Sequence, residues 1–320
     1  MRQIILNIEA DMKTFLIISE YDGLGISVMT VSPQCTPRAV LQIAHGICGR
    51  KERFLPFMEH MAANGIICIA NDHRGHGGSV LRKEDLGYMY KGGYKALVSD
   101  MRSVTGWIRK EYPDLPFFLL GHSMGSLAAR LYVKNDDYGL SGLILCGTPS
   151  ENTFAPVGRL ITGALNLSGL GRIRPEIFQK ITSGGYNRKF RNEGFQAWTC
   201  SDPQVRSSVS NDPLCNYTCT ANASYNLLCM LKEAYSDKNW KIGNPDMGIT
   251  LLSGEDDPCT KWGASLKVTA GLFEKMGYRK ISMKTYPGMR HEILNEKDKE
   301  TVWNDILDFI VSRHASYLCP

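Results

Sequence analysis

Ser123 stands at the centre of Gly121-His-Ser-Met-Gly125, the only Gly-x-Ser-x-Gly match in the chain. The apolar run 117–120 before it is typical of a buried strand, and residues 126–132 after it are typical of a helix. A sharp turn between a strand and a helix exposes a serine hydroxyl, and larger residues two positions away on either side would clash there. A glycine-flanked serine alone could be only a turn, but this context predicts that Ser123 is a nucleophile.

A serine hydroxyl becomes a good nucleophile when a base takes its proton and a carboxylate orients that base. After a serine in such a turn, the acid comes next in the chain and the histidine last. His291 fits the base, because it lies in a loop between a predicted strand and the last predicted helix. Asp257 fits the acid, because it follows an apolar strand and Pro258 holds it extended. Asp256 remains a rival and Glu255 a weaker one, and any of these carboxylates could belong to a solvated turn.

The negative oxygen that forms when a nucleophile adds to a carbonyl needs two backbone N–H donors. Met124 would supply one from the start of the helix, where N–H groups lack helical partners. The other is expected from the loop after the first long parallel strand, His45-Gly46-Ile47-Cys48, where Gly46 permits a close backbone approach. The Ile47 N–H is the predicted donor. We interpret His45 as a structural hydrogen-bonding residue.

Other kinds of chemistry find little support in the sequence. There is no phosphate-binding Gly-x-x-x-x-Gly-Lys-Ser/Thr and no dinucleotide-binding fingerprint. His73 and His76 could suggest a metal, but no third ligand lies at a suitable spacing. The net charge of +5 is modest, and no tract of Lys and Arg is typical of nucleic-acid binding. We therefore expect no metal, no cofactor and no nucleic-acid partner.

The candidate residues fall among short apolar runs, which are typical of strands buried on both faces of a parallel sheet. These runs are 40–44, 66–70, 117–120 and 143–146, and two further strands are expected at 248–252 and 280–286, all after an antiparallel hairpin of 14–19 and 25–31. Helices are expected at 94–111, 227–235 and 301–314, the first with an apolar stripe of Leu97, Met101, Val104 and Ile108. Alternating strands and helices predict an α/β fold with a mostly parallel, doubly wound sheet.

The alternation breaks between residues 148 and 225, where Gly, Asn and Ser are frequent and no strand is convincing. We interpret this block as a helical cap inserted into one domain, whose core is formed by 1–147 and 226–320. The block contains eight Lys or Arg and five Asp or Glu, so it carries most of the positive net charge.

The cellular setting is predicted from what the sequence lacks. No run approaches the roughly 18 apolar residues of a transmembrane helix. The first residues, in which Glu9 and Asp11 interrupt a short apolar patch, do not resemble a secretory signal. Many of the ten cysteines stand in apolar runs, where a thiol behaves as a small hydrophobic group. We expect a cytoplasmic protein with reduced thiols.

Five motifs in order give the chain a family resemblance. They are His45-Gly46, Asn71-Asp-His-Arg-Gly-His-Gly-Gly-Ser79, Gly121-His-Ser-Met-Gly125, Gly254-x-x-Asp257-Pro258 and Tyr286-Pro-Gly-x-x-His-Glu292. Together they resemble the monoacylglycerol lipase and lysophospholipase group of α/β-hydrolases, with domains of the serine aminopeptidase type. The resemblance implies the α/β-hydrolase fold, a triad of Ser123, Asp257 and His291, and oxyanion amides from Ile47 and Met124. It favours Asp257 over Asp256, makes 148–225 a cap over an acyl pocket, and makes 71–79 a structural loop. There Asp72 and Arg74 are expected to pair with each other or with backbone.

The chain departs from the family after His45-Gly46, where the family has His-Gly-x-x-Glu-His-x-x-Arg-Tyr. Gly49 replaces the family's Glu, Arg50 its His and Phe54 its Tyr. That Glu is the expected partner of the Arg matched here by Arg53, so we expect Arg53 to lack this acidic neighbour, with Glu52 as the alternative that neutralises its charge. Arg53 and Arg50 are then candidate substrate contacts, either solvated on the surface or binding an anionic head group.

The resemblance implies a serine ester hydrolase that cleaves single-chain lipid esters, a monoacylglycerol or a lysophospholipid, through an acyl-enzyme intermediate. Its cap could touch a membrane surface transiently. Alternatives are an aminopeptidase-type serine peptidase, a small-ester carboxylesterase and, more remotely, a non-catalytic binding protein on the same fold. The basic cap counts against the peptidase, which would need an acidic anchor for a free amino group.

Overall fold

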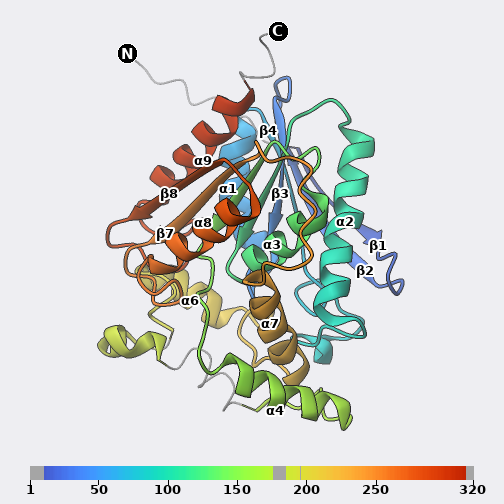
Figure 1. The fold of residues 1–320 in the computed structure, drawn as a ribbon, viewed down its shortest axis with the longest axis vertical. Helices are drawn as coiled ribbons and strands as arrows, with labels where there is room; N and C mark the ends of the chain where they lie inside the picture. Colours follow the sequence, from blue (N-terminus) through green and yellow to red (C-terminus); the bar gives the residue numbers. More distant parts are fainter. Residues whose placement is uncertain (1–10, 176–184, 195, 315–320) are drawn as a thin grey trace.

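The computed structural model describes residues 11–175, 185–194 and 196–314 of the chain (Figure 1). Its strands form one eight-stranded sheet in the order β1-β2-β4-β3-β5-β6-β7-β8. The strands are β1 (Asp11–Ile18), β2 (Gly25–Ser32), β3 (Ala39–Ala44), β4 (Ile66–Asn71), β5 (Phe117–His122), β6 (Gly142–Cys146), β7 (Gly248–Gly254) and β8 (Lys280–Tyr286). β2 pairs antiparallel with both β1 and β4, and the pairs from β4 to β8 are parallel. The predicted fold class is confirmed.

The central strands consist mostly of apolar residues, because helices cover both faces of the sheet. Every residue of β3, β4, β5, β6 and β7 is buried. One face packs against α1 (Leu55–Ala63) and α9 (Lys299–His314). The other packs against α2 (Gly93–Glu111), α3 (Met124–Asp136) and α8 (Ala264–Met276), with the predicted stripe of α2 fully in this core. The two apolar layers hold the sheet rigid, and its loops can then carry polar chemistry.

Parallel strands bring their carboxyl ends to one edge of the sheet, and the candidate residues follow those ends. His122 of β5 pairs in register with Cys146 of β6. Gly254 of β7 pairs with Tyr286 of β8, so the loops that contain Asp257 and His291 start side by side. The topology therefore gathers three segments more than 30 residues apart in sequence at one place.

Residues 148–225 hold only helices and turns wherever the structure describes them. The helices are α4 (Ala155–Leu167), the 3-10 helix η3 (Tyr186–Glu193), α6 (Pro203–Asn211) and the start of α7 (Ala221–Ala234). In Figure 1 they lie beyond the carboxyl end of the sheet, with α4 at the lower margin and α7 next to α3. α7 runs through the expected border at 225–226, so the division into core and cap stays a prediction.

In the loop 71–79, Asp72 and Arg74 do not pair with each other, but Asp72 binds backbone N–H groups, which was the other expectation. Asp72 accepts from the ammonium and the N–H of Lys51, both at 2.8 Å, and from the Gly78 N–H at 2.7 Å. Arg74 is fully buried and donates from Nε to Asp100 at 2.7 Å. Each of the two side chains instead makes its ion pair with a residue more than 20 positions away in the sequence, Asp72 with Lys51 and Arg74 with Asp100.

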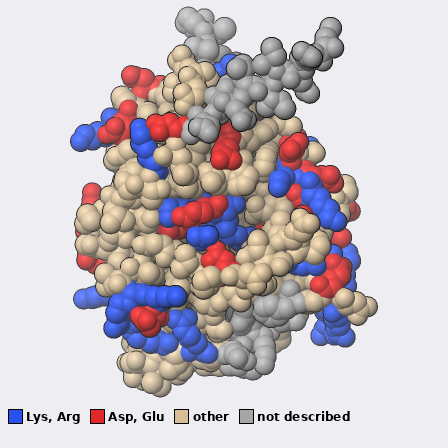
Figure 2. Space-filling model, turned by 180° about the vertical axis from the view of Figure 1, so that it is seen from behind, with Lys and Arg blue, Asp and Glu red and all other residues tan. Residues whose placement is uncertain are grey.

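The described helices include none that is both long and apolar enough to cross a membrane. On the face seen in Figure 2, basic and acidic side chains lie close to one another in several places, and the group at the lower left is mostly basic.

Candidate active site

Ser123 occupies a strained turn between β5 and α3. Its φ of 53° and ψ of −119° are values that non-glycine residues rarely adopt. A Cβ on Gly121 would lie 2.4 Å from the Gly125 carbonyl oxygen, and one on Gly125 would lie 2.0 Å from the Ala44 carbonyl oxygen. Both glycines are therefore needed for the close packing that holds the turn, as the sequence predicted.

Ser123, His291 and Asp257 form a continuous hydrogen-bonded chain inside the protein. His291 Nε2 lies 2.8 Å from Ser123 Oγ, and His291 Nδ1 lies 2.8 Å from Asp257 Oδ2. A carboxylate only accepts, so Nδ1 carries the imidazole proton and Nε2 is free to accept from the hydroxyl. All three residues are buried. Asp256, the rival acid, instead forms an ion pair with Lys189 at the surface.

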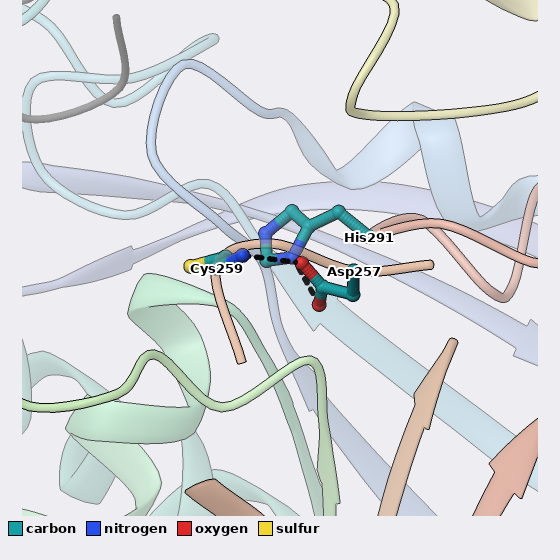
Figure 3. A group of neighbouring side chains, drawn as sticks. All are labelled: Asp257, Cys259 and His291. Atoms are coloured by element: carbon teal, nitrogen blue, oxygen red, sulfur yellow. Dashed lines mark hydrogen bonds and ion pairs between the residues drawn. The ribbon is translucent and has the colours of Figure 1, made fainter. Parts of the chain in front are cut away.

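Figure 3 shows the carboxylate of Asp257 joined by dashed lines to the ring of His291 and to the backbone nitrogen of Cys259. That N–H donates to Asp257 Oδ1 at 2.8 Å, so each carboxylate oxygen has a partner. Asp257, Cys259 and His291 are near enough to hold a metal ion. A cation at Nδ1 would replace the proton that binds Asp257, so this arrangement suits a relay better than a metal centre.

Burial and charge divide the histidines around the site into one base and several neutral rings. Burial disfavours the imidazolium of His291, but the charge of Asp257 and its hydrogen bond outweigh this and raise the pKa of His291. Burial lowers the pKa of His122 to about 4 and that of His45 to about 3. His122 Nε2 donates to the His291 carbonyl at 3.1 Å. Only His291 is thus poised to change charge near neutral pH.

The loop 45–48 lies directly against the nucleophile. A Cβ on Gly46 would be 3.0 Å from Ser123 Cβ, and Ile47 and Met124 both line the adjacent cavity. His45 Nε2 accepts from the His73 N–H at 2.9 Å, so its Nδ1 carries the proton and donates to the Gly46 carbonyl at 2.7 Å. This geometry suits the structural role expected of His45. It leaves the two predicted oxyanion donors beside Ser123, where their role stays a prediction.

A cavity of about 230 Å³ opens beside Ser123. Apolar side chains of α3 and α7 line one part of it: Met124, Leu127, Leu227, Leu228 and Leu231. The polar side chains include Arg53, Thr199, Asn216, Glu292 and Asn295. A cavity with a mainly apolar wall and a few polar groups fits a ligand that has an acyl chain and a small polar part.

The expectation that Arg53 lacks an acidic neighbour is wrong. Glu292, 239 residues further along the chain, forms a close ion pair with it. The alternative of a solvated Arg53 also fails, because its side chain is only 19% exposed. Arg50 does not line the cavity and binds Asp212 at 2.8 Å. The polar part of the cavity therefore carries a neutralised pair and no excess positive charge.

Sequence reasoning missed Glu292 and Trp198 as parts of the site. In the sequence Glu292 is simply the residue after His291, and no local pattern links it to Arg53. The Trp198 ring centre lies 5.0 Å from that of His291, at an angle of 41°. Trp198 comes from the insertion, whose sequence gives no periodic signal for its position.

The chain matches the family model described as serine aminopeptidase, S33, over residues 35–298. It is 24% identical to a monoacylglycerol lipase of Mycolicibacterium smegmatis over 300 residues, which are 92% of this chain and 97% of the relative. It is 28% identical to a monoglyceride lipase of Rattus norvegicus over 297 residues, which are 89% and 85% of the two chains.

A solved carboxyl esterase from Bacillus coagulans, in complex with glycerol, has a similar fold. The TM-score is 0.86 at 27% identity, and the alignment covers 95% of this chain and 99% of that one.

Replacement of Asp257 by Asn tests the relay. A neutral amide at this position cannot stabilise an imidazolium, so kcat should fall by about 10³- to 10⁴-fold. Wild-type kcat/KM should decline in acid with a midpoint above about 6.5, the ordinary imidazole value, because the pKa of His291 is raised. In Asp257→Asn this midpoint should move to lower pH. Asp256→Asn is the matched control and should change kcat by about twofold or less. A severe loss in Asp256→Asn with a mild one in Asp257→Asn would move the acid by one residue.

Proposed function

The chain belongs to the serine aminopeptidase S33 family of α/β-hydrolases and is a carboxylic ester hydrolase; we propose that it cleaves esters of single-chain lipids through an acyl-enzyme intermediate. The observation that carries this proposal is the buried chain from Ser123 through His291 to Asp257, placed at the wall of a largely apolar cavity.

In the proposed mechanism, Ser123 Oγ attacks the ester carbonyl while His291 Nε2 takes the hydroxyl proton. The Ile47 and Met124 N–H groups receive the negative oxygen of the tetrahedral intermediate. Asp257 stabilises the imidazolium, which then gives its proton to the departing alcohol. A water molecule, activated by the same His291, hydrolyses the acyl-enzyme and restores the serine.

For the substrate, we propose an acyl chain along α3 and α7 and a neutral, glycerol-like head group near Arg53 and Glu292. The ion pair has no net charge to attract an anion, yet it offers a donor and an acceptor to hydroxyl groups. The relatives named monoacylglycerol lipase and monoglyceride lipase, and the related esterase bound to glycerol, support this choice. A monoacylglycerol is thus favoured over a lysophospholipid.

The peptidase alternative has weaker support. Among the described residues that line the cavity, Glu292 is the only carboxylate, and Arg53 already occupies it. A free amino terminus would therefore meet no unpaired acidic anchor there. A non-catalytic role would leave the relay of Ser123, His291 and Asp257 without a purpose.

We also propose that the cap touches lipid surfaces. Val157, Leu160 and Ile161 of α4 are 59%, 75% and 46% exposed, and Leu167 at its end is 92% exposed. An apolar helix face of this kind binds at a lipid–water boundary. In Leu160→Asp, hydrolysis of an ester embedded in vesicles should slow while hydrolysis of a dispersed short ester stays constant. Equal rates of wild type and variant on vesicles would exclude this contact.

The protein is further proposed to work in the reducing cytoplasm. All nine cysteines within the described residues are free thiols, as expected where disulfides do not persist. Cell fractionation checks this placement, which recovery in a secreted fraction would overturn.

An ester series tests the proposed reaction. Wild type should hydrolyse monoacylglycerols and p-nitrophenyl esters, with kcat/KM rising with chain length until the cavity is filled, by about fourfold per buried methylene. An aminoacyl p-nitroanilide should be a poor substrate. Ser123→Ala should lose the ester activity and keep the thermal unfolding temperature of a folded protein. Faster cleavage of the aminoacyl amide than of every ester would favour the peptidase.

A head-group comparison tests the role of the ion pair. With one acyl chain, monoacylglycerol should have a higher kcat/KM than anionic lysophosphatidylglycerol. Glu292→Gln leaves Arg53 unpaired and should shift this ratio towards the anionic lipid by about tenfold, the effect of one hydrogen bond to a charged group. Glu52→Gln, which changes a charge outside the cavity, is the control. An unchanged ratio in Glu292→Gln would mean that the pair does not contact the head group.

A further inference from the structure

Arg290, the residue before His291, anchors the loop of the proposed base to the cap. Its side chain is buried, and its guanidinium donates to both carboxylate oxygens of Glu193 at 2.8 Å. It also donates to the Ala197 carbonyl at 2.5 Å and lies 3.9 Å from the centre of the Phe190 ring. The bonds to Glu193 both come from Nη2, and the bond to Ala197 comes from Nη1, so two nitrogens of one guanidinium hold the cap segment from different directions.

Further hydrogen bonds join the same two segments close to Arg290. The Glu292 N–H donates to the Thr199 carbonyl at 2.7 Å. The buried carboxylate of Glu296 accepts from the Arg290 N–H at 3.0 Å and from the Ser201 N–H at 2.8 Å. Residues 290–296 are thus hydrogen-bonded at several points to residues 193–194 and 196–201, about 90 positions earlier in the sequence.

The cap segment also contacts the imidazole. The Trp198 ring lies beside His291, and the Tyr186 ring packs against Trp198 with centres 5.0 Å apart. The side of His291 that faces the cap is therefore filled by an aromatic ring that the cross-links hold in place. The two ring nitrogens remain free of the cap: Nδ1 bonds Asp257 and Nε2 bonds Ser123.

We propose that Arg290 is a positioning residue for His291, and that cap residues 193–194 and 196–201 form one unit with the loop of the base. The bond from Arg290 to Glu193 holds the loop so that Nε2 stays in reach of Ser123 Oγ. This inference rests on the proposed function, since it gives His291 the role of base. It predicts that loss of the anchor slows chemistry even for a substrate too small to touch the cap.

Arg174 provides a matched control, because it is a second arginine that ties the cap to the core. It donates to the Glu84 carbonyl at 2.8 Å and to the Leu86 carbonyl at 2.6 Å, and it also bonds the Thr218 carbonyl. It neither lines the cavity nor contacts the loop of His291. Loss of Arg174 should therefore affect the cap without affecting the base.

The experiment compares Arg290→Met and Arg174→Met on p-nitrophenyl acetate and on p-nitrophenyl laurate. Arg290→Met should lower kcat about 10- to 100-fold on both esters, with a smaller change in KM, because a misplacement near 1 Å costs about this much. Arg174→Met should keep wild-type turnover of the acetate. If Arg290→Met turns over the acetate normally and loses only the laurate, Arg290 holds the cap alone and the inference is overturned.

Two milder variants keep the inference testable if Arg290→Met does not fold. Glu193→Gln acts from a side chain that is 43% exposed and should lower acetate turnover in the same direction by less. Arg290→Lys keeps the positive charge but has one nitrogen in place of the two that bind Glu193 and Ala197. It should recover part of the acetate turnover that Arg290→Met loses. If Arg290→Met unfolds, a folded Glu193→Gln with wild-type acetate turnover overturns the inference. A wild type that hydrolyses neither ester would instead refute the proposed function.

Discussion

The backbone strain at Ser123 is the constraint on which the site depends. A non-glycine residue with φ of 53° costs of order 1–3 kcal/mol, which the surrounding structure must offset. Tight packing of Gly121 and Gly125 and the bond from the Ser123 N–H to the Cys146 carbonyl at 3.0 Å provide that support. The strain points Oγ out of the sheet edge, towards the loop that holds His291. Every other element of the site is placed relative to this one hydroxyl.

Among the histidines of the site, only His291 has a carboxylate, Asp257, in hydrogen-bond contact with its ring in the described structure. Burial keeps His45, His122 and His76 neutral, with pKa values lowered to between about 3 and 4. Asp257 is the carboxylate in contact with His291, and its interaction exceeds the cost of burying an imidazolium. The neutral rings bond backbone groups instead: His45 the Gly46 carbonyl and His122 the His291 carbonyl.

Patterns of neighbouring residues in the sequence predicted the strands and the turn at the proposed nucleophile. They did not predict ion pairs between residues far apart in the sequence. Continuous apolar runs predicted the parallel strands because burial on both faces leaves no polar positions. Ser123 was predicted from its glycines and its flanking elements, and His291 from its place in the chain, and the structure brings the two side chains into hydrogen-bond contact. The partners of Arg53 and Arg74 were mispredicted, because each pairs with a carboxylate brought near only by the topology. Trp198 could not be placed either, since the insertion carries no periodic pattern that fixes its packing.

The central claim is that Ser123 is the activated nucleophile, and covalent labelling with a fluorophosphonate tests it most directly. Intact-mass measurement of the native protein should find one phosphonyl group per chain, with the modified peptide containing Ser123. Labelling should slow as His291 becomes protonated in acid, because the base can then no longer take the hydroxyl proton. The folded Ser123→Ala variant should take up no label. A label that persists at the same rate in that variant, or that maps to another residue in the native protein, would contradict the account.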